Sequence, residues 1–311
     1  MALDLPSPDR PLRLGTRGSP LALAQAREAR DRLMAAHRLP EAAFAIVVIR
    51  TTGDRVQDRP LSELGGKGLF TREIEAELAA GRIDAAIHSM KDMPTLQPAG
   101  LAITCLLPRE DVRDAFVSNA ATSLAALPAG AIVGTSSLRR RAQLLSRRPD
   151  LAVVEFRGSV ETRLRKLRDG AAAATFLAIA GLRRLGIAAP ATPVAVDDML
   201  PAVAQGAIGV EQRADDARVA ALLAAIHHRE TGERIAAERA FLAGLDGSCQ
   251  TPIAGLAEIA GGRLRLRGEI IRPDGSERIA CDLEGAVADG PALGAAAAAE
   301  LRGKAAPGFF G

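Results

Sequence analysis

Short apolar runs recur along the first half of the chain and predict buried β-strands. They cover residues 12–16, 45–51, 83–88, 131–135 and 151–156 and are rich in Val, Ile, Leu and Ala. Short apolar runs without a polar face are typical of strands that are buried on both sides of a sheet.

Segments with helical spacing alternate with these strands. In residues 71–80, Ile74 and Leu78 fall on the same helical face. Strands that alternate with helices predict βαβ units and mainly parallel sheets, so we expect an α/β fold. Near the C-terminus, a helix over residues 229–243 precedes an alternating pattern around residues 273–276 ("PDGS"), which predicts a hairpin in a small α+β domain.

The composition is that of a globular protein and disfavours several classes of function. At 311 residues, with 48% hydrophobic and 25% charged residues, the chain is long enough for two or three domains. It has 40 basic and 37 acidic residues, no Trp or Tyr and only 8 Phe, which disfavours nucleic-acid binding through a basic patch with stacking aromatics. Because we find neither a bilayer-spanning apolar run nor a signal peptide, we expect a cytoplasmic protein.

Three predicted strands end in a turn that carries Gly, Ser or Thr, and Arg, and that leads into a helix. The segments are "LGTRGSPLALAQ", "VGTSSLRRRAQLL" and "EFRGSVETRLRKL". A helix N-terminus binds anions, but arginine in the first turn opposes the helix dipole unless a carboxylate or phosphate joins it. Ordinary capping with solvent-facing arginines is the alternative for one such turn. Three turns of this kind at strand ends favour a polyanionic ligand.

The segment "DAAIHSMKDMP" ends a buried strand with Lys91 and Asp92. The chain has only four lysines, Lys67, Lys91, Lys166 and Lys304, so a retained lysine indicates a position that arginine does not serve. We expect Lys91 to bind a ligand carboxylate and Asp92 to face a developing cation. A surface ion pair of little consequence is the alternative interpretation.

Cys249 lies in a polar glycine loop, "LDGSCQTPIAG", and is a candidate nucleophile or attachment point. Cys105 and Cys281 lie in strand-like patterns and are predicted to be packing residues. Three widely spaced cysteines fit neither a disulfide framework nor a zinc site. None of the four histidines has a motif that suits a Cys–His hydrolase or a metal enzyme.

Together these segments resemble the motifs of the porphobilinogen deaminase family over nearly the whole chain. The matching stretches, in order, are "TRGSPLALAQ", "GGKGLF", "DAAIHSMKDMP", "PREDVRDAFVS", "GTSSLRRRAQL", "FRGSVETRLRKL", "LAIAGLRRLG", "LPAVAQGAIGVE" and "GSCQTPIAG". The resemblance implies three domains: residues 1–107 with 207–225, residues 108–206, and residues 226–311. The first two are expected to be like the lobes of a type II periplasmic-binding-protein fold with the active-site cleft between them, and the third to be a small α+β domain.

The resemblance also implies a reaction and a cofactor. Dipyrromethane is expected to be attached by a thioether to a loop cysteine, which Cys249 matches, and no metal is implied. Four porphobilinogen molecules join this primer, each with loss of ammonia, and linear hydroxymethylbilane is released. The partner is therefore a small-molecule substrate, with no nucleic acid and no membrane, and we expect a monomer.

The resemblance assigns roles to residues of the motifs. Asp92 matches the catalytic carboxylate. The cofactor is expected to lie near Ser89, Lys91, Asp54, Asp114, Thr135, Ser136, Ser137, Arg139 and Arg140. Substrate and the growing chain are expected to contact Arg17, Ser19, Lys67, Phe70, Arg157 and Arg163, with Lys67 and Phe70 in a loop that covers the cleft. Because every porphobilinogen ring carries an acetate and a propionate, this ligand explains the three arginine-bearing helix starts.

The chain departs from the family pattern at three places: Ser159 where Asn is usual, Ala204 where Gly is usual, and the alanines at 171–174 where an acidic residue is usual. Serine still caps a helix, so we expect little loss at Ser159. The rival functions are a periplasmic-type anion receptor, a nucleic-acid-binding protein and a structural protein. A covalent group on Cys249 would separate the enzyme from all three.

Overall fold

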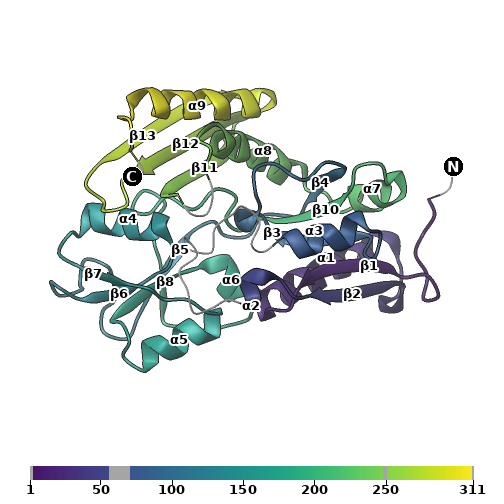
Figure 1. The fold of residues 1–311 in the computed structure, drawn as a ribbon, viewed down its shortest axis with the longest axis horizontal. Coiled ribbons are helices and arrows are strands. Elements are labelled where there is room, and N and C mark those ends of the chain that lie inside the picture. The colour runs from purple at the N-terminus through teal and green to yellow at the C-terminus, as the bar shows by residue number, and fades with distance from the viewer. Residues whose placement is uncertain (1–2, 56–70, 248–250, 310–311) are drawn as a thin grey trace. The chain divides into compact units, whose positions relative to one another are not determined.

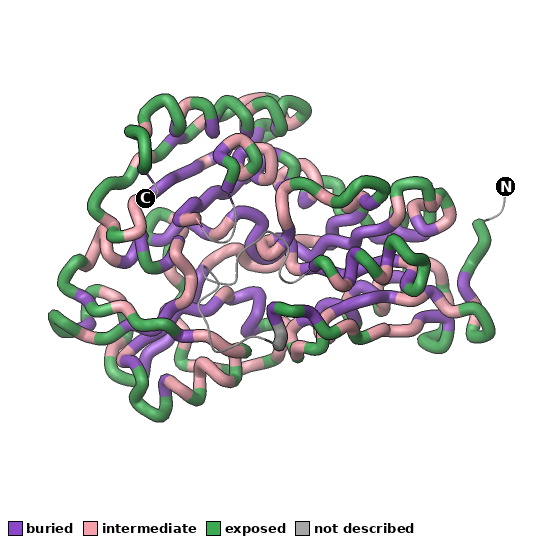
Figure 2. The backbone as a smooth tube through the Cα atoms, in the orientation of Figure 1, coloured by how far each residue is buried: buried purple, intermediate pink, exposed green. Residues whose placement is uncertain are grey.

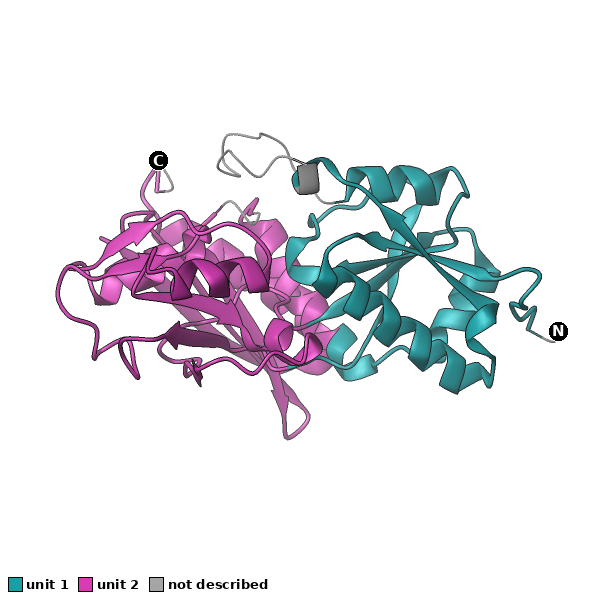
Figure 3. Ribbon diagram, turned by 90° about the horizontal axis from the view of Figure 1, so that it is seen from below, with its two compact units in different colours: residues 1–57, 66–110, 207–232 teal, residues 58–65, 111–206, 233–311 magenta. Residues whose placement is uncertain are grey.

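The computed structural model describes residues 3–55, 71–247 and 251–309, except for the side chains of Asp54 and Arg55. These residues form two compact units, which are coloured separately in Figure 3. Each unit is built from segments that are distant in the sequence. The described part of the first comprises residues 3–55, 71–110 and 207–232, and that of the second comprises residues 111–206, 233–247 and 251–309.

The first unit is an α/β structure built around a five-stranded sheet (Figure 1). The strand order is β2-β1-β3-β10-β4. Strands β1, β2 and β3 are parallel, and β10 runs antiparallel to both of its neighbours. The elements are β1 (Leu12–Arg17), α1 (Pro20–His37), η1 (Glu41–Ala43), β2 (Phe44–Ile49), α2 (Thr52–Arg55), α3 (Arg72–Ala79), β3 (Ala85–Ser89), η2 (Met90–Asp92), β4 (Leu101–Leu106), β10 (Ile208–Arg213) and α7 (Ala217–Ala224).

Helices cover both faces of this sheet. On one face, apolar side chains of α1 and α7, among them Leu33 and Leu222, pack in one cluster with Ile87 of β3. On the other face, Ile74 and Leu78 of α3 belong to a second apolar cluster. Burial of these apolar stripes stabilises helices of such length more than helix propensity does. The strands β1, β3 and β10 are buried along most of their length, as Figure 2 shows.

The second unit repeats this arrangement in a sheet of order β7-β6-β8-β5-β9. Strand β6 is parallel to β7 and β8, and β5 runs antiparallel to β8 and β9. The antiparallel strand again lies next to the edge. The elements are β5 (Asp114–Ser118), β6 (Ile132–Gly134), α4 (Leu138–Arg147), β7 (Ala152–Val154), α5 (Val160–Arg168), β8 (Ala174–Ala178), α6 (Ile179–Arg184) and β9 (Ala191–Pro193).

The second unit also contains a three-stranded antiparallel meander, β11-β12-β13. The predicted hairpin around residues 273–276 connects β12 to β13, and the carboxylate of Asp274 accepts a hydrogen bond from the N–H of Ser276 at 3.0 Å, which fixes the turn. The elements of this part are α8 (Arg229–Gly244), which begins in the first unit, β11 (Ile253–Ala260), β12 (Arg263–Ile271), β13 (Arg278–Ala286), η3 (Val287–Asp289) and α9 (Gly290–Lys304).

The predicted fold class is confirmed. The five apolar runs form β1, β2, β3, β6 and β7, and the helical segments 71–80 and 229–243 form α3 and α8 to within a residue or two at each end. The two five-stranded sheets have equivalent strand orders, and each has one antiparallel strand next to an edge. This is the arrangement expected for the two lobes of a type II periplasmic-binding-protein fold.

Candidate active site

The carboxyl end of the parallel strands in the first unit brings four predicted site residues to one hollow. Arg17 ends β1, Ser89 ends β3, and Asp92 lies in η2, immediately after β3. These three residues and Ser19 line a hollow whose other lining residues are Leu21, Ala22, Gln25, Thr71, Ile87, His88 and Met93. The edge of an α/β sheet at which parallel strands end is the usual place for a ligand site.

Local sequence sets the first turn of this hollow. The hydroxyl of Ser19 accepts a hydrogen bond from the N–H of Ala22 at 3.3 Å and caps α1, with Pro20 at the first helical position. The hydroxyl of Thr16 donates to the carbonyl of Ala22 at 3.3 Å and ties the end of β1 to the same turn. The predicted helix start is therefore confirmed, and its N-terminus opens on the hollow.

The same hollow contains a histidine that the sequence did not single out. His88 is 5% exposed, and its Nε2 lies 3.2 Å from Oε2 of Glu211, which is fully buried in β10. Glu75 of α3 is also buried, and burial followed by the charge of Glu211 raises the pKa of Glu75. The sequence analysis missed Glu211, although an acidic residue inside the apolar run "AIGVEQ" is a signal that could have indicated a buried carboxylate.

In the second unit, the turn between β6 and α4 places three hydroxyls at the corresponding edge. The hydroxyl of Thr135 accepts from the N–H of Ser137 at 3.2 Å, and that of Ser136 from the N–H of Phe156 at 3.0 Å. The hydroxyl of Ser137 caps α4 by accepting from the N–H of Arg140 at 3.4 Å. Each hydroxyl is the acceptor in its bond, so its hydrogen can still be donated to an anion.

Asp114, Arg139 and Arg140 form a buried ion triad in the second unit. The carboxylate of Asp114 lies 2.6 Å from the guanidinium of Arg139 and 2.7 Å from that of Arg140, and the amide of Gln205 donates to it at 2.9 Å. All three charged residues are at most 5% exposed. Burial alone would raise the pKa of Asp114, but the two positive charges and their hydrogen bonds outweigh it and hold that pKa well below its usual value.

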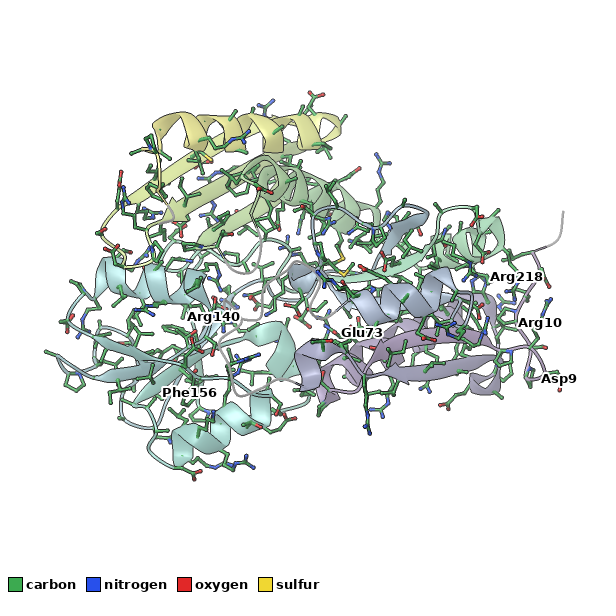
Figure 4. All side chains as sticks on the ribbon, in the orientation of Figure 1. Asp9, Arg10, Glu73, Arg140, Phe156 and Arg218 are labelled. Carbon is green, nitrogen blue, oxygen red and sulfur yellow. The ribbon has the colours of Figure 1, made fainter. Side chains whose placement is uncertain are left out.

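We expected the arginines at the start of α4 to meet a carboxylate of a ligand, but the triad shows a carboxylate of the protein in that place. The carboxylate that Arg139 and Arg140 meet belongs to the chain itself, and each arginine also donates to a main-chain carbonyl, of Leu200 or Phe176, at 2.8 Å. Arg140 lies beneath α4 in Figure 4. The Nε atoms of both arginines are buried and have no hydrogen-bond partner among the described residues.

The third predicted turn lies between β7 and α5. The hydroxyl of Ser159 accepts from the N–H of Thr162 at 3.2 Å and caps α5, as predicted. Nε of Arg163 donates to the carbonyl of Gly158 at 2.9 Å, and the ammonium of Lys166 donates to the carbonyl of Arg157 at 3.1 Å. The cations of this helix therefore gather at the turn that ends β7.

Several predicted site residues lie outside the described residues. They are Lys67, Phe70 and Cys249, together with the side chain of Asp54, whose backbone is in α2. Lys91 is described and lies in η2, but it is not among the lining residues of the hollow. Among the residues with described placement, no group of three or more His, Cys, Asp and Glu side chains is arranged to hold a metal ion.

Two family models cover most of the chain. The model for "Porphobilinogen deaminase, dipyromethane cofactor binding domain" matches residues 12–221, and that for "Porphobilinogen deaminase, C-terminal domain" matches residues 233–303. The chain belongs to the porphobilinogen deaminase family. It is accordingly a transferase that joins four porphobilinogen molecules with loss of ammonia and releases linear hydroxymethylbilane, so the predicted family and reaction are confirmed.

Known relatives agree with this assignment. The chain is 68% identical over 307 residues to a porphobilinogen deaminase of Paracoccus denitrificans, with 98% of each chain covered. It is 57% identical over 298 residues to that of Nitrobacter winogradskyi, with 96% of this chain and 94% of the relative covered. Among solved structures, a periplasmic substrate-binding protein of an ABC transporter from Coxiella burnetii is 16% identical with a TM-score of 0.43, covering 71% of this chain and 93% of its own.

Proposed function

We propose that Asp92 is the catalytic carboxylate of this porphobilinogen deaminase. The observation that carries the proposal is its place at the end of β3, in one hollow with Arg17, Ser19 and Ser89. When a porphobilinogen loses ammonia, a positive charge develops on the pyrrole and its methylene carbon. A fixed carboxylate stabilises that charge where it develops, and a cation and hydroxyls nearby suit the acetate and propionate of the same ring.

We also propose that the predicted anion-binding residues divide between holding substrate and holding the cofactor. Arg17 and Ser19 in the first unit, and Arg157 and Arg163 in the second, bind carboxylates of the substrate and of the growing chain. Lys67 and Phe70 are assigned to the covering loop. The charges at the turn after β7 support the roles of Arg157 and Arg163, because the ligand has two carboxylates on every ring.

The dipyrromethane cofactor supplies the carbon to which the first porphobilinogen joins. We assign its carboxylates to the hydroxyls of Thr135, Ser136 and Ser137, and to Arg139 and Arg140. The three hydroxyls each accept a hydrogen bond from a main-chain N–H, so their hydrogens are available to such a ligand. Ser89, Lys91, Asp54 and Asp114 complete the proposed cofactor site, with Asp114 holding both arginines in place.

Attachment of the cofactor through Cys249 is supported by the state of the other two cysteines. Cys105 and Cys281 are buried in β4 and β13. Burial raises the pKa of Cys105 to about 12 and that of Cys281 to about 11. At neutral pH both are thiols and poor nucleophiles, as expected for packing residues.

Intact mass of the denatured protein tests the attachment. The parent chain and a Cys281→Ser variant should both carry the added mass of two linked pyrroles, and a Cys249→Ser variant should carry none after incubation with porphobilinogen. Peptide mapping should place the added mass on residue 249. A parent chain that stays unmodified after that incubation would refute the covalent cofactor.

The role of Asp92 is tested by Asp92→Asn, with Asp215→Asn as a matched control, since Asp215 is an exposed aspartate of the same unit. Asp92→Asn should keep the thermal midpoint and the cofactor mass but lose about 100-fold or more in kcat, because the amide carries no charge to stabilise the cation. Asp215→Asn should behave as the parent. Normal turnover in Asp92→Asn would remove Asp92 from its proposed role.

We further propose a cytoplasmic monomer of three domains that binds no nucleic acid, with bounds at 1–107 plus 207–225, 108–206 and 226–311. The separate β11-β12-β13 sheet supports the third domain, and the near balance of 40 basic and 37 acidic residues supports the absence of nucleic-acid binding. In the described part of the chain, every helix is too short or too polar to cross a membrane. Light scattering after size exclusion tests the monomer.

A further inference from the structure

His88 and Glu211 form a buried dyad on the face of the first sheet that α3 covers. Their strands are antiparallel neighbours: Gly209 of β10 pairs with His88, and Glu211 pairs with Ala86, so Glu211 and His88 point to the same face. The distance from Nε2 of His88 to Oε2 of Glu211 is 3.2 Å. Glu75 reaches this face from α3 and is 8% exposed.

The surroundings of the dyad are apolar. Ile74, Leu78, Ile83 and Ala86 form a buried cluster on the same face. Within the described residues, Oε1 of Glu211 is buried and has no hydrogen-bond partner, and the same is true of Oε1 of Glu75. A buried carboxyl without full hydrogen bonding destabilises the fold, so two of them beside one histidine indicate a functional requirement.

The chemistry of the pair follows from the bond between them. A carboxylate that accepts from Nε2–H holds the imidazole in one orientation and one tautomer, and leaves the lone pair on Nδ1. It also stabilises the imidazolium that forms when Nδ1 takes a proton. His88 lines the same hollow as Asp92, the proposed site of the reaction.

We infer that His88 is the proton acceptor for each ring addition and that Glu211 is its positioning residue. The inference rests on the proposed role of the Asp92 hollow. When a ring derived from porphobilinogen attacks the next deaminated substrate, a carbon–carbon bond forms and the α-carbon of that ring must lose its hydrogen. The electrons of the carbon–hydrogen bond return to the ring, the proton goes to Nδ1 of His88, and it then passes to the released ammonia as ammonium.

In this scheme Asp92 stabilises the cation and His88 accepts the proton, so one carboxylate does not have to do both at the same time. Among the described residues, the charged groups around His88 include Glu211 from β10, Glu75 from α3, and Asp92 and Arg17 in the hollow. Burial, followed by the charge of Glu211, raises the pKa of Glu75, whereas the hydrogen bond to Nε2 of His88 is made by Glu211.

The test uses His88→Gln and Glu211→Gln in the cofactor-loaded enzyme. Glu77→Gln is the control, because Glu77 is a glutamate of α3 that pairs with Arg82 away from the dyad. His88→Gln should lower kcat by about 100-fold with KM little changed. With porphobilinogen deuterated at its unsubstituted α-carbon, both dyad variants should show a primary isotope effect on kcat, because proton removal has become rate-limiting. The parent enzyme and Glu77→Gln should show a much smaller one.

Three outcomes overturn the inference. A folded, cofactor-loaded His88→Gln enzyme with unchanged kcat would show that the imidazole takes no proton. Loss of folding in both dyad variants, or a lower kcat without an isotope effect, would assign the dyad to stability alone. Asp92→Asn separates these cases from failure of the proposed site: if Asp92→Asn is active, the hollow is not the reaction centre, whatever the dyad variants do.

Discussion

The carboxylate of Asp114 lies 2.7 Å from the guanidinium of Arg140, and both side chains are buried in the second unit. Asp114 begins β5 and pairs across the sheet with Ala178, the last residue of β8, so it lies at the edge where the parallel strands end. Arg140 reaches the same edge from the first turns of α4. The sheet topology thus brings a counter-charge to the proposed cofactor arginines before any ligand arrives.

Asp114→Asn should strongly destabilise the protein. The change leaves two buried guanidinium groups without their carboxylate, and removing one partner of a buried ion pair costs about 3–5 kcal/mol. The free energy of unfolding from urea denaturation measures the effect. Asp150→Asn is the matched control, because Asp150 pairs with Arg148 at the surface of the same unit and should change stability little.

The difference between Asp114→Asn and the parent should not vary with pH near neutrality. A lowered pKa gives stability that is present above the ordinary value of 3.8 and is lost only as pH falls through the lower folded value. Between about pH 5 and pH 8 the carboxylate is ionised in both states. An Asp114→Asn variant as stable as the parent would contradict the triad.

Ala204→Gly should stabilise the protein. Ala204 has φ +61°, a conformation that costs an L-residue about 1–2 kcal/mol and that glycine adopts without this cost. The N–H of Ala204 donates to Glu238 at 2.6 Å, a bond that glycine keeps. After the extra chain entropy of glycine, a gain of up to about 1 kcal/mol remains.

Ala257→Gly is a control for this prediction, because it is expected to destabilise the protein. Its N–H donates to the other oxygen of Glu238 at 2.8 Å, but Ala257 lies within β11, where glycine should destabilise by about 0.5–1 kcal/mol. Thermal unfolding of both variants measures the two effects. Destabilisation by Ala204→Gly would show that the left-handed backbone is not strained.

Ser159→Asn should leave stability almost unchanged, although it restores the usual family residue. Both side chains accept a hydrogen bond at a helix N-terminus, and Ser159 already accepts from the N–H of Thr162. Ser159→Ala should cost about 1 kcal/mol, because the cap is lost. Equal stability of the Ala and Asn variants in urea denaturation would show that the cap contributes nothing.

Glu75→Gln should become more stable relative to the parent as pH rises. Burial raises the pKa of Glu75 above its ordinary value of 4.5, and the charge of Glu211 adds to this. The stability that a raised pKa contributes is fully present below the pKa of the unfolded chain, and it is lost as pH rises through the pKa of the folded protein. The neutral amide avoids that loss.

The free energies of unfolding of the parent and of Glu75→Gln, measured from pH 4.5 upward, give the change of their difference with pH. Glu77→Gln provides a contrast in the same helix, because its hydrogen bond to Arg82 lowers the pKa of Glu77. That variant should lose stability relative to the parent at neutral pH and lose none well below the lowered pKa. A pH-independent difference for Glu75→Gln would mean that Glu75 has no raised pKa.

The local features of the fold were predictable from sequence because their causes are local. Apolar runs identified five strands, and Ser19 and Ser159 cap the helices that they were predicted to begin. A cap depends on a side chain and an N–H only three residues away, so the spacing of residues determines it.

The contacts that the sequence did not reveal join residues far apart in the chain. His88 and Glu211 are separated by 123 positions, and no spacing rule connects them. Asp114 and Arg139 are 25 positions apart and meet only because β5 enters the sheet next to β8. The exposure of the arginines at the start of α4 could not be predicted for the same reason: their burial depends on a carboxylate supplied by another strand.

The position of β10 also determines when the first unit can fold on a ribosome. The edge strand β4 has β10 as its neighbour, and β10 comprises residues 208–213. The whole β7-β6-β8-β5-β9 sheet ends at residue 193 and has been made before β10 emerges. Domains generally fold as units during synthesis. The strands β1, β2 and β3 are synthesised first. Their sheet is nevertheless completed only after all strands of the β7-β6-β8-β5-β9 sheet are available to pair.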